Sequence, residues 1–302
     1  MYKKTTIVLA LILLTGCSNL FFYPMKKEVF KPQQFGLTHD DIFLSTNDNT
    51  VLHGWHLPAT SPSKSSIIFF HGNAENITTH IASVYWLPEN GYEVFLFDYR
   101  GYGRSQGTPQ IDTVIEDARL MIDYVSNHST STNQNFVIFG QSLGAAIAIN
   151  AAAELENKNL KALIIDSSFS GFRKIAREKL SDIWLTWPVQ APLSLAFTNK
   201  YSPKKMAPII SPVPLLVIHG SADKIIPIRH GEEIFQSAKP PKSFWKIEDG
   251  RHIDSTLQLN VRERILDFLD MATNNKLPQS QDNSAIIKQG ERASITLEKK
   301  LD

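Results

Sequence analysis

Apolar residues fall into short runs that are separated by longer segments of mixed polarity. Most of these runs consist almost entirely of apolar residues, which is typical of strands buried on both faces of a sheet. They lie at 67–70, 93–97, 136–139, 162–165 and 215–218, with a further run near 243–247. Residues 51–57 alternate between apolar and polar side chains instead, and this pattern predicts an antiparallel strand at the edge of the sheet.

Between these runs, apolar residues recur with the spacing of helices. The periodicity predicts helices at about 77–87, 113–127, 143–155, 229–237 and 255–271. Strands that alternate with helices predict one α/β domain, in which a mostly parallel twisted sheet carries helices on both faces. From Asn274 onward the chain is polar and aperiodic, so we expect a mobile tail at 274–302. Ile286 and Ile287 would nevertheless let this tail dock.

The composition narrows the classes of function. With 302 residues and 42% hydrophobic residues, the chain has enough apolar material for one sizeable core. A formal net charge of +1 gives no basic field, and no zinc-finger or RNA-binding signature is present, so we expect no nucleic-acid partner. His39, His53, His56, His80, His128 and His230 lack the paired spacing of metal ligands, so we predict no metal site.

The N-terminus has the pattern of a targeting segment. Lys3 and Lys4 precede an apolar run at 7–14 that is too short to span a membrane as a folded helix. The sequence Leu14-Thr15-Gly16-Cys17 resembles the lipobox of bacterial lipoproteins. This resemblance implies a signal peptide at 1–16 and lipidation of Cys17, which is the sole cysteine. The alternative is an ordinary signal peptide followed by a stray cysteine.

The lipobox carries further expectations about location. Ser18 follows the cysteine, and in lipoproteins of this kind a residue other than aspartate implies passage to the outer membrane, here facing the periplasm. Residues 17–36 are then a lipid-anchored linker. Residues 20–23 (LFFY) either lie at the membrane interface or pack on the domain.

One strand changes into a helix within a very short turn. Gly140-Gln141-Ser142-Leu143-Gly144 joins the run at 136–139 to the helix expected from Leu143 onward. Glycines on both sides of the serine permit a sharp turn that lifts its hydroxyl clear of the backbone. The serine would then lie at a helix N-terminus, where free N–H groups favour developing negative charge. A plain strand end with a serine N-cap is the alternative.

Polar or glycine-rich sequences follow the other strands as well. In parallel sheets, active residues gather just beyond the carboxyl ends of the strands. These ends carry His71-Gly72-Asn73-Ala74, Asp98 to Ser105, Asp166, His219-Gly220-Ser221-Ala222-Asp223 and Gly250-Arg251-His252.

These loops supply the parts of a nucleophilic site. Ser142, Asp223 and His252 provide a nucleophile, an orienting acid and a base, and the N–H groups of Leu143 and Asn73 provide oxyanion donors. Asp166 also follows a strand and competes with Asp223 as the acid. Asp223 is preferred because it lies one strand before the histidine.

These motifs together resemble the α/β-hydrolase superfamily. The similarity is greatest to the branch with an HGNA loop, a DYRGYGxS segment, a GQSLG elbow and an HGSAD acid loop, and it extends over about 37–271. The resemblance implies an α/β-hydrolase domain at 37–273 that cleaves acyl esters or thioesters without a metal or cofactor. Arg251 and Ile253, on either side of His252, depart from the usual pattern and leave the fit of that loop open.

The segment between the sixth and seventh strands is expected to determine specificity. Many of its apolar residues, beginning with Phe172, fall at helical spacing. They predict either an ordinary packed helix or a lid at about 169–206 whose aromatic residues line an acyl pocket. The candidate lining residues are Phe172, Trp184 and Trp187.

The sequence therefore predicts a serine hydrolase that acts on small acyl esters or thioesters at the membrane surface, held there through Cys17. The alternatives are a peptidase of the same fold and a catalytically silent lipoprotein that uses the fold as a binding module. The intact nucleophile, acid, base and oxyanion loops favour the enzyme.

Overall fold

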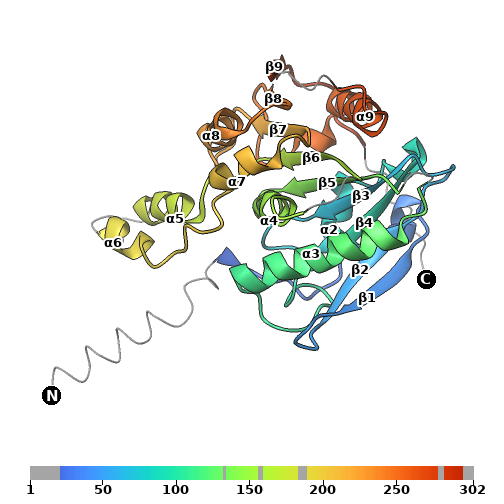
Figure 1. Ribbon diagram of the computed structural model, residues 1–302, viewed down its shortest axis with the longest axis horizontal. Helices are drawn as coiled ribbons and strands as arrows, with labels where there is room; N and C mark the ends of the chain where they lie inside the picture. Colours follow the sequence, from blue (N-terminus) through green and yellow to red (C-terminus); the bar gives the residue numbers. More distant parts are fainter. Residues whose placement is uncertain (1–20, 132–133, 156–158, 183–188, 278–281, 295–302) are drawn as a thin grey trace.

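The sheet follows from strands that are apolar on both faces. The computed structural model describes residues 21–131, 134–155, 159–182, 189–277 and 282–294. Within these residues nine strands form one sheet in the order β1-β2-β4-β3-β5-β6-β7-β8-β9 (Figure 1). The strands are β1 (Asp40–Ser45), β2 (Val51–Leu57), β3 (Ser65–Phe70), β4 (Tyr92–Phe97), β5 (Phe136–Gln141), β6 (Leu160–Asp166), β7 (Leu215–Gly220), β8 (Lys242–Ile247) and β9 (Asp282–Ile287). β1 with β2 and β2 with β4 pair antiparallel, and every other pair is parallel.

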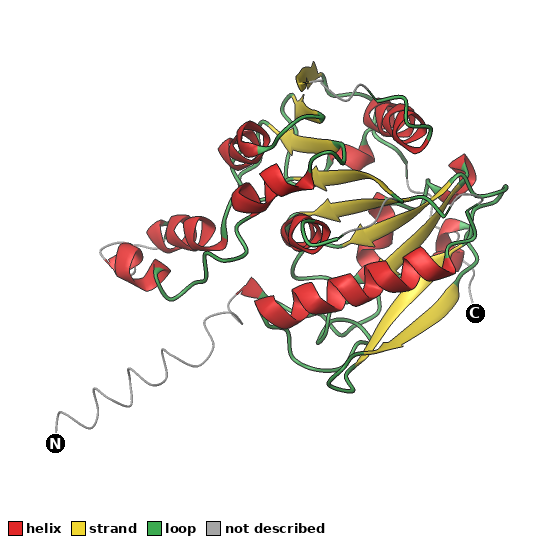
Figure 2. Cartoon of the chain, in the orientation of Figure 1, coloured by secondary structure: helices red, strands yellow, loops and turns green. Residues whose placement is uncertain are grey.

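Helices cover both faces of the sheet (Figure 2). They are α2 (Ile77–His80), α3 (Ile111–His128), α4 (Leu143–Ala152), α5 (Phe172–Ser181), α6 (Gln190–Ser194), α7 (Pro203–Ile210), α8 (Arg229–Ser237) and α9 (Leu259–Thr273). Short 3₁₀ helices lie at Pro32–Phe35, Ile81–Ser83, Pro88–Asn90 and Ser255–Leu257. The prediction of an α/β-hydrolase fold is confirmed.

The core consists of two apolar clusters, one on each side of the sheet. Successive residues of β3 alternate between them: Ile68 and Phe70 belong to the cluster that includes α3 and α4, whereas Ile67 and Phe69 belong to the one that includes α9. This alternation follows from the two-residue period of a strand, and it explains why the strand sequences are apolar throughout.

Several elements differ from the pattern-based prediction. The strand at 51–57 is antiparallel as expected, but it is not at the edge, because β1 pairs with its outer side. β1 begins with two aspartates and has only two buried residues, so its pattern is weak. The helix expected at 77–87 is only the single turn of α2 followed by a 3₁₀ turn. α4 ends at Ala152 rather than at 155.

The C-terminal segment also differs from the expected mobile tail. Asp282–Ile287 forms β9, which extends the sheet by parallel pairing with β8. Ile287 is buried in the core cluster, whereas Ile286 is exposed. The backbone pairing and one buried isoleucine therefore hold this strand, although its other residues are largely polar.

Candidate active site

The loops that carry the predicted site residues lie at one end of the sheet. The arrowheads of the parallel strands β5 and β6 point toward the end from which α5 and α6 project, and the described chain also begins there (Figure 1). Because these strands are parallel, the loops after β3, β5, β7 and β8 open at this same end.

Ser142 lies in a strained turn between β5 and α4. Its backbone φ of 54° and ψ of −116° fall outside the regions that residues other than glycine normally adopt. The two glycines of this turn, Gly140 and Gly144, are required because a side chain at either position would clash with the backbone. A Cβ on Gly144 would lie 2.1 Å from the carbonyl oxygen of Phe70, and one on Gly140 would lie 2.6 Å from the Cα of Ala145. Only glycine allows β5, α4 and β3 to approach this closely.

The structure brings Ser142, His252 and Asp223 together in one hydrogen-bonded series. His252 Nε2 lies 3.0 Å from Ser142 Oγ, and His252 Nδ1 lies 2.7 Å from Asp223 Oδ2. Ser142 is 8% exposed, and the Asp223 side chain is fully buried. A serine hydroxyl next to an imidazole that is oriented by a buried carboxylate is the arrangement that makes serine nucleophilic.

The His252 loop accommodates both departures from the usual sequence pattern. The Arg251 side chain is largely exposed, and its backbone N–H donates to Asp254 Oδ1 at 3.0 Å. Ile253 has a φ of +49°, and its N–H donates to Ser167 Oγ at 3.2 Å. Ser167 therefore supports the loop that carries the base. This role of Ser167 has little signal in the sequence, where the serine is marked only by its position directly after Asp166.

Donors surround Asp223 and stabilise its ionised form. Its Oδ1 accepts the N–H groups of Ile225 at 2.8 Å and Ile226 at 2.9 Å, and His219 Nε2 lies 3.5 Å from Oδ2. Burial alone would raise the pKa of the Asp223 carboxyl. Hydrogen bonds from His219 and His252 outweigh burial and hold the pKa well below its usual range, so Asp223 is a carboxylate at neutral pH.

Asp166, the competing acid, faces a different set of partners. Its Oδ2 accepts hydrogen bonds from Ser255 Oγ at 2.5 Å and Gln141 Nε2 at 3.1 Å, and its Oδ1 accepts one from Ser167 Oγ at 3.0 Å. Among the described residues it makes no hydrogen bond to His252. Its backbone carbonyl accepts the N–H of Ser142 at 2.9 Å, so its strand end supports the elbow.

The two residues whose backbone N–H groups are the predicted oxyanion donors, Leu143 and Asn73, lie in segments next to Ser142. The N–H of Leu143 opens α4 directly after Ser142, and Gly72 brings the loop after β3 against the serine. A Cβ on Gly72 would lie 3.6 Å from Ser142 Cβ. Among the described residues, no backbone hydrogen bond outside the helices and strands uses the N–H of Leu143 or Asn73. His71, at the root of this loop, donates from Nδ1 to the Gly72 carbonyl at 2.7 Å, as a structural residue would.

A cleft of about 760 Å³ opens beside His252. Its walls combine charged residues such as Glu75 and Lys224 with apolar ones such as Ile225 and Leu257, and His80 closes one side. Burial lowers the pKa of His80 to about 4, so this ring is neutral at neutral pH. The cleft is therefore lined by both polar and apolar groups beside His252, and Ser142 is not among its lining residues.

The predicted lid residues are only partly described. Phe172 begins α5 and is 1% exposed, in edge contact with Phe21 and Phe169. This favours a packing role for Phe172 in the form of the molecule seen here. Trp184 and Trp187 lie outside the described residues, and so does Cys17.

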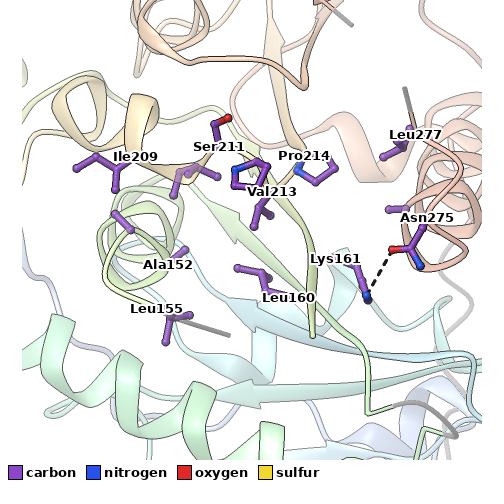
Figure 3. Close-up of a pocket in the computed structure, with 14 residues that line it drawn as sticks. Ala152, Leu155, Leu160, Lys161, Ile209, Ser211, Val213, Pro214, Asn275 and Leu277 are labelled. Carbon is purple, nitrogen blue, oxygen red and sulfur yellow. Dashed lines mark hydrogen bonds between the residues drawn. The ribbon is translucent and has the colours of Figure 1, made fainter. Parts of the chain in front are cut away.

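A second hollow is remote from these loops. It lies near the start of β6 and β7, at the opposite ends of these strands from Asp166 and Asp223, and has a volume of about 570 Å³. Figure 3 shows the residues that line it. Its walls are mainly apolar, and within it Lys161 Nζ donates to Asn275 Oδ1 at 3.4 Å. Among the described residues that line this pocket, no hydroxyl lies beside a histidine, in contrast to Ser142.

The described residues contain neither a metal-binding cluster nor a membrane-spanning helix. Outside the gaps listed above, no group of three or more His, Cys, Asp or Glu side chains has an arrangement that could bind a metal ion. Across the same ranges, no helix combines the length and the apolar character needed to cross a bilayer.

Comparisons with known proteins identify the family. The family described as Hydrolase_4 (Serine aminopeptidase, S33) matches residues 61–208. The uncharacterized protein YfhR of Escherichia coli (strain K12) is 35% identical over 263 residues, which cover 85% of this chain and 88% of YfhR. The alpha/beta hydrolase domain-containing protein WAV2 of Arabidopsis thaliana is 29% identical over 237 residues, which cover 75% of this chain and 76% of WAV2.

The solved structures agree on the fold. The Pyrococcus furiosus esterase Pf2001 superimposes with a TM-score of 0.67 at 21% identity, and the match covers 84% of this chain and 98% of the esterase. This chain belongs to the α/β-hydrolase superfamily, and this membership supports hydrolase activity.

Proposed function

We propose that this protein is a serine hydrolase that cleaves carboxylic esters or thioesters through Ser142, His252 and Asp223. The observation that carries the proposal is the series of two hydrogen bonds, 3.0 Å from Ser142 Oγ to His252 Nε2 and 2.7 Å from His252 Nδ1 to Asp223 Oδ2. A binding module has no need to hold a serine in a strained turn beside a correctly oriented base.

In the proposed reaction, Ser142 Oγ attacks the carbonyl carbon of the acyl group while its proton passes to His252 Nε2. The oxyanion accepts hydrogen bonds from the backbone N–H groups of Leu143 and Asn73. The ionised Asp223 stabilises the imidazolium that forms on His252. His252 then gives its proton to the leaving alcohol or thiol, and the acyl group stays on Ser142. Water, deprotonated by His252, releases the acid and restores the serine.

The lining of the cleft beside His252 indicates the substrate class. The mixed lining of the cleft beside His252 suits an acyl ester or thioester that carries both polar and apolar parts. The description of the matching family as a serine aminopeptidase favours a second candidate, cleavage of an N-terminal residue. Glu75 at the cleft is half-exposed and would be available to pair with a substrate amine.

The membrane-surface location follows from the lipobox resemblance. Because four residues of chain reach at most about 14 Å, an acyl group on Cys17 would keep the domain close to the lipid surface. More than one acyl chain is needed for stable anchoring, and lipoproteins of this kind carry several on this cysteine. Tyr23 is exposed near the start of the described chain, and Leu195 is exposed directly after α6, which projects from the same end (Figure 1). We propose that this end faces the outer membrane from the periplasm.

Active-site labelling tests the nucleophile. A fluorophosphonate probe should attach to Ser142, and Ser142→Ala should abolish labelling and lower turnover of p-nitrophenyl esters by about four to six orders of magnitude. Ser126→Ala changes a partly exposed serine on α3; it is the matched control and should label like the wild type. Undiminished esterase activity in Ser142→Ala protein would refute the mechanism.

A substrate panel separates the candidate activities. Hydrolysis of p-nitrophenyl esters and acyl thioesters of graded chain length should exceed hydrolysis of aminoacyl p-nitroanilides. The reverse order would favour the aminopeptidase, and a protein that neither labels nor turns over any of them would be the silent binding module.

Fractionation tests the anchor. The wild-type protein should sediment with membranes, whereas Cys17→Ser should prevent formation of the lipidated form. Recovery of wild-type protein in the soluble periplasmic fraction, with an unmodified Cys17 by mass spectrometry, would refute the proposed location.

A further inference from the structure

The first described residues run along the loop that follows β3. We call residues 21–29 the strap. Its contacts are made mainly by its backbone: the Phe21 carbonyl accepts a hydrogen bond from Asn73 Nδ2 at 2.7 Å, and the Tyr23 N–H donates to Asn73 Oδ1 at 3.0 Å. Farther along, Asn76 Nδ2 donates to the carbonyls of Met25 and Lys27 at 3.0 and 2.9 Å.

The side chain of Asn73 makes four hydrogen bonds. Its Oδ1 accepts three hydrogen bonds, from the N–H groups of Tyr23 and Ala74 and from the hydroxyl of Tyr102 at 2.7 Å. Its amide donates to the strap. These bonds join three separate segments of the chain, at 21–23, 73–74 and Tyr102.

The strap is also held by packing and by the Tyr102 hydroxyl. Phe21 makes edge contacts with Phe172 and Phe197, with ring centroids 5.2 and 5.0 Å apart. The Tyr102 hydroxyl accepts the Tyr23 N–H at 3.1 Å while it donates to Asn73. Burial raises the pKa of Tyr102 well above its usual value, so this hydroxyl keeps its proton and stays a donor.

We propose that the side chain of Asn73 is a positioning residue, through which the strap holds the oxyanion donor of the same residue in place. This inference rests on the proposed function, because it concerns the N–H of Asn73 as a donor to the transition state. The backbone at Asn73 leads into Ala74, which has a φ of +68°, so the local turn needs external support to keep its geometry.

Loss of the Asn73 side chain should change kcat rather than KM. An oxyanion donor acts on charge that develops only in the transition state, so a misplaced donor lowers kcat and leaves KM nearly unchanged. Displacement of a catalytic group by about 1 Å can cost roughly 100-fold in rate. Affinity for a trifluoromethyl ketone, which forms a tetrahedral adduct with the serine, should fall with kcat.

The test uses full-length protein with p-nitrophenyl acetate as the substrate. Asn73→Ala should lower kcat and the trifluoromethyl ketone affinity by about the same factor, 10- to 100-fold, with KM within about twofold of the wild type. Tyr102→Phe keeps the ring and removes the hydroxyl, so a smaller loss of about 3- to 10-fold in kcat is expected. This second variant keeps the test informative if Asn73→Ala fails to fold.

Asn76→Ala is the matched control. It removes two hydrogen bonds to the strap and the N-cap of α2, so Tm should fall while kcat stays within about threefold. A loss of kcat in Asn73→Ala no larger than that in Asn76→Ala, or a loss that appears in KM alone, would overturn the inference. Absence of hydrolysis and labelling in the wild type would instead remove the proposed function, and the inference with it.

Discussion

Two buried aspartates lie at the ends of neighbouring strands and have different surroundings. Asp166 is the last residue of β6, and Asp223 follows β7 in the same part of the sheet. Both are less than 10% exposed. Asp223 accepts hydrogen bonds from two backbone N–H groups and contacts His252. Asp166 instead accepts hydrogen bonds from two serine hydroxyls and one side-chain amide.

The different donors lead to opposite electrostatic outcomes. The pKa of Asp223 is depressed because hydrogen bonds from His219 and His252 outweigh burial. Burial raises the pKa of Asp166 above its usual value in spite of the hydrogen bonds from Ser255, Ser167 and Gln141. A strand end therefore supplies only a place for a carboxyl group, and the groups that face it decide whether it can stabilise an imidazolium.

The largest expected difference between the two acids is in turnover. Asp223→Asn should keep the shape of the site but hold His252 in the wrong tautomer, which lowers kcat by about 10⁴-fold. The measurement is kcat for a p-nitrophenyl ester, with fluorophosphonate labelling as a second readout. Asp166→Asn is the matched control, and its kcat should stay within about tenfold of the wild type. A larger loss in the control than in Asp223→Asn would transfer the role of the acid to Asp166.

Substitution of Asp166 should affect the free energy of unfolding more than it affects turnover. Asp166→Ala leaves the buried groups of Gln141, Ser167 and Ser255 without their acceptor, which should lower the free energy of unfolding by about 1–3 kcal/mol. Urea unfolding monitored by circular dichroism measures this change. Asp166→Asn keeps one acceptor oxygen and should lose less. Equal stability of the wild type and Asp166→Ala would show that these hydrogen bonds contribute nothing net.

The smallest effect is a difference in pH dependence. Because the folded-state pKa of Asp223 is depressed, its carboxylate contributes stability above about pH 4, and this contribution is lost as the pH falls toward the folded pKa. The sign is reversed for Asp166, whose raised pKa makes its contribution largest in acid. That contribution is lost as the pH rises from about 4 through the folded pKa.

Unfolding free energies between about pH 3 and 7 measure this contrast. The stability advantage of the wild type over Asp223→Asn should shrink toward acid pH, whereas its advantage over Asp166→Asn should grow. Parallel pH profiles for the two variants would contradict the assigned pKa directions.

Local sequence is sufficient to predict those strands and helices whose pattern of apolar residues is continuous along the chain. The apolar runs of β3 to β8 and the periodicity of α3 and α8 predict those elements to within a few residues, because burial on both faces leaves a dense local pattern. The GQSLG turn and the loops after the strands identify Ser142, Asp223 and His252, which the folded chain brings together. β1 and β9 were missed, because short edge strands of mixed polarity are held mainly by backbone pairing with a partner far along the chain.

What the sequence determined by itself is therefore the order of strands and helices, the strained serine turn and the residue types available at each strand end. The tertiary structure alone decided which aspartate meets His252 and which residues support the loops, such as Ser167 beneath Ile253. It also decided that the strap binds Asn73 through the backbone of Phe21 and Tyr23. Backbone N–H and carbonyl groups are the same in every sequence, so contacts of this kind leave no pattern of side chains to detect.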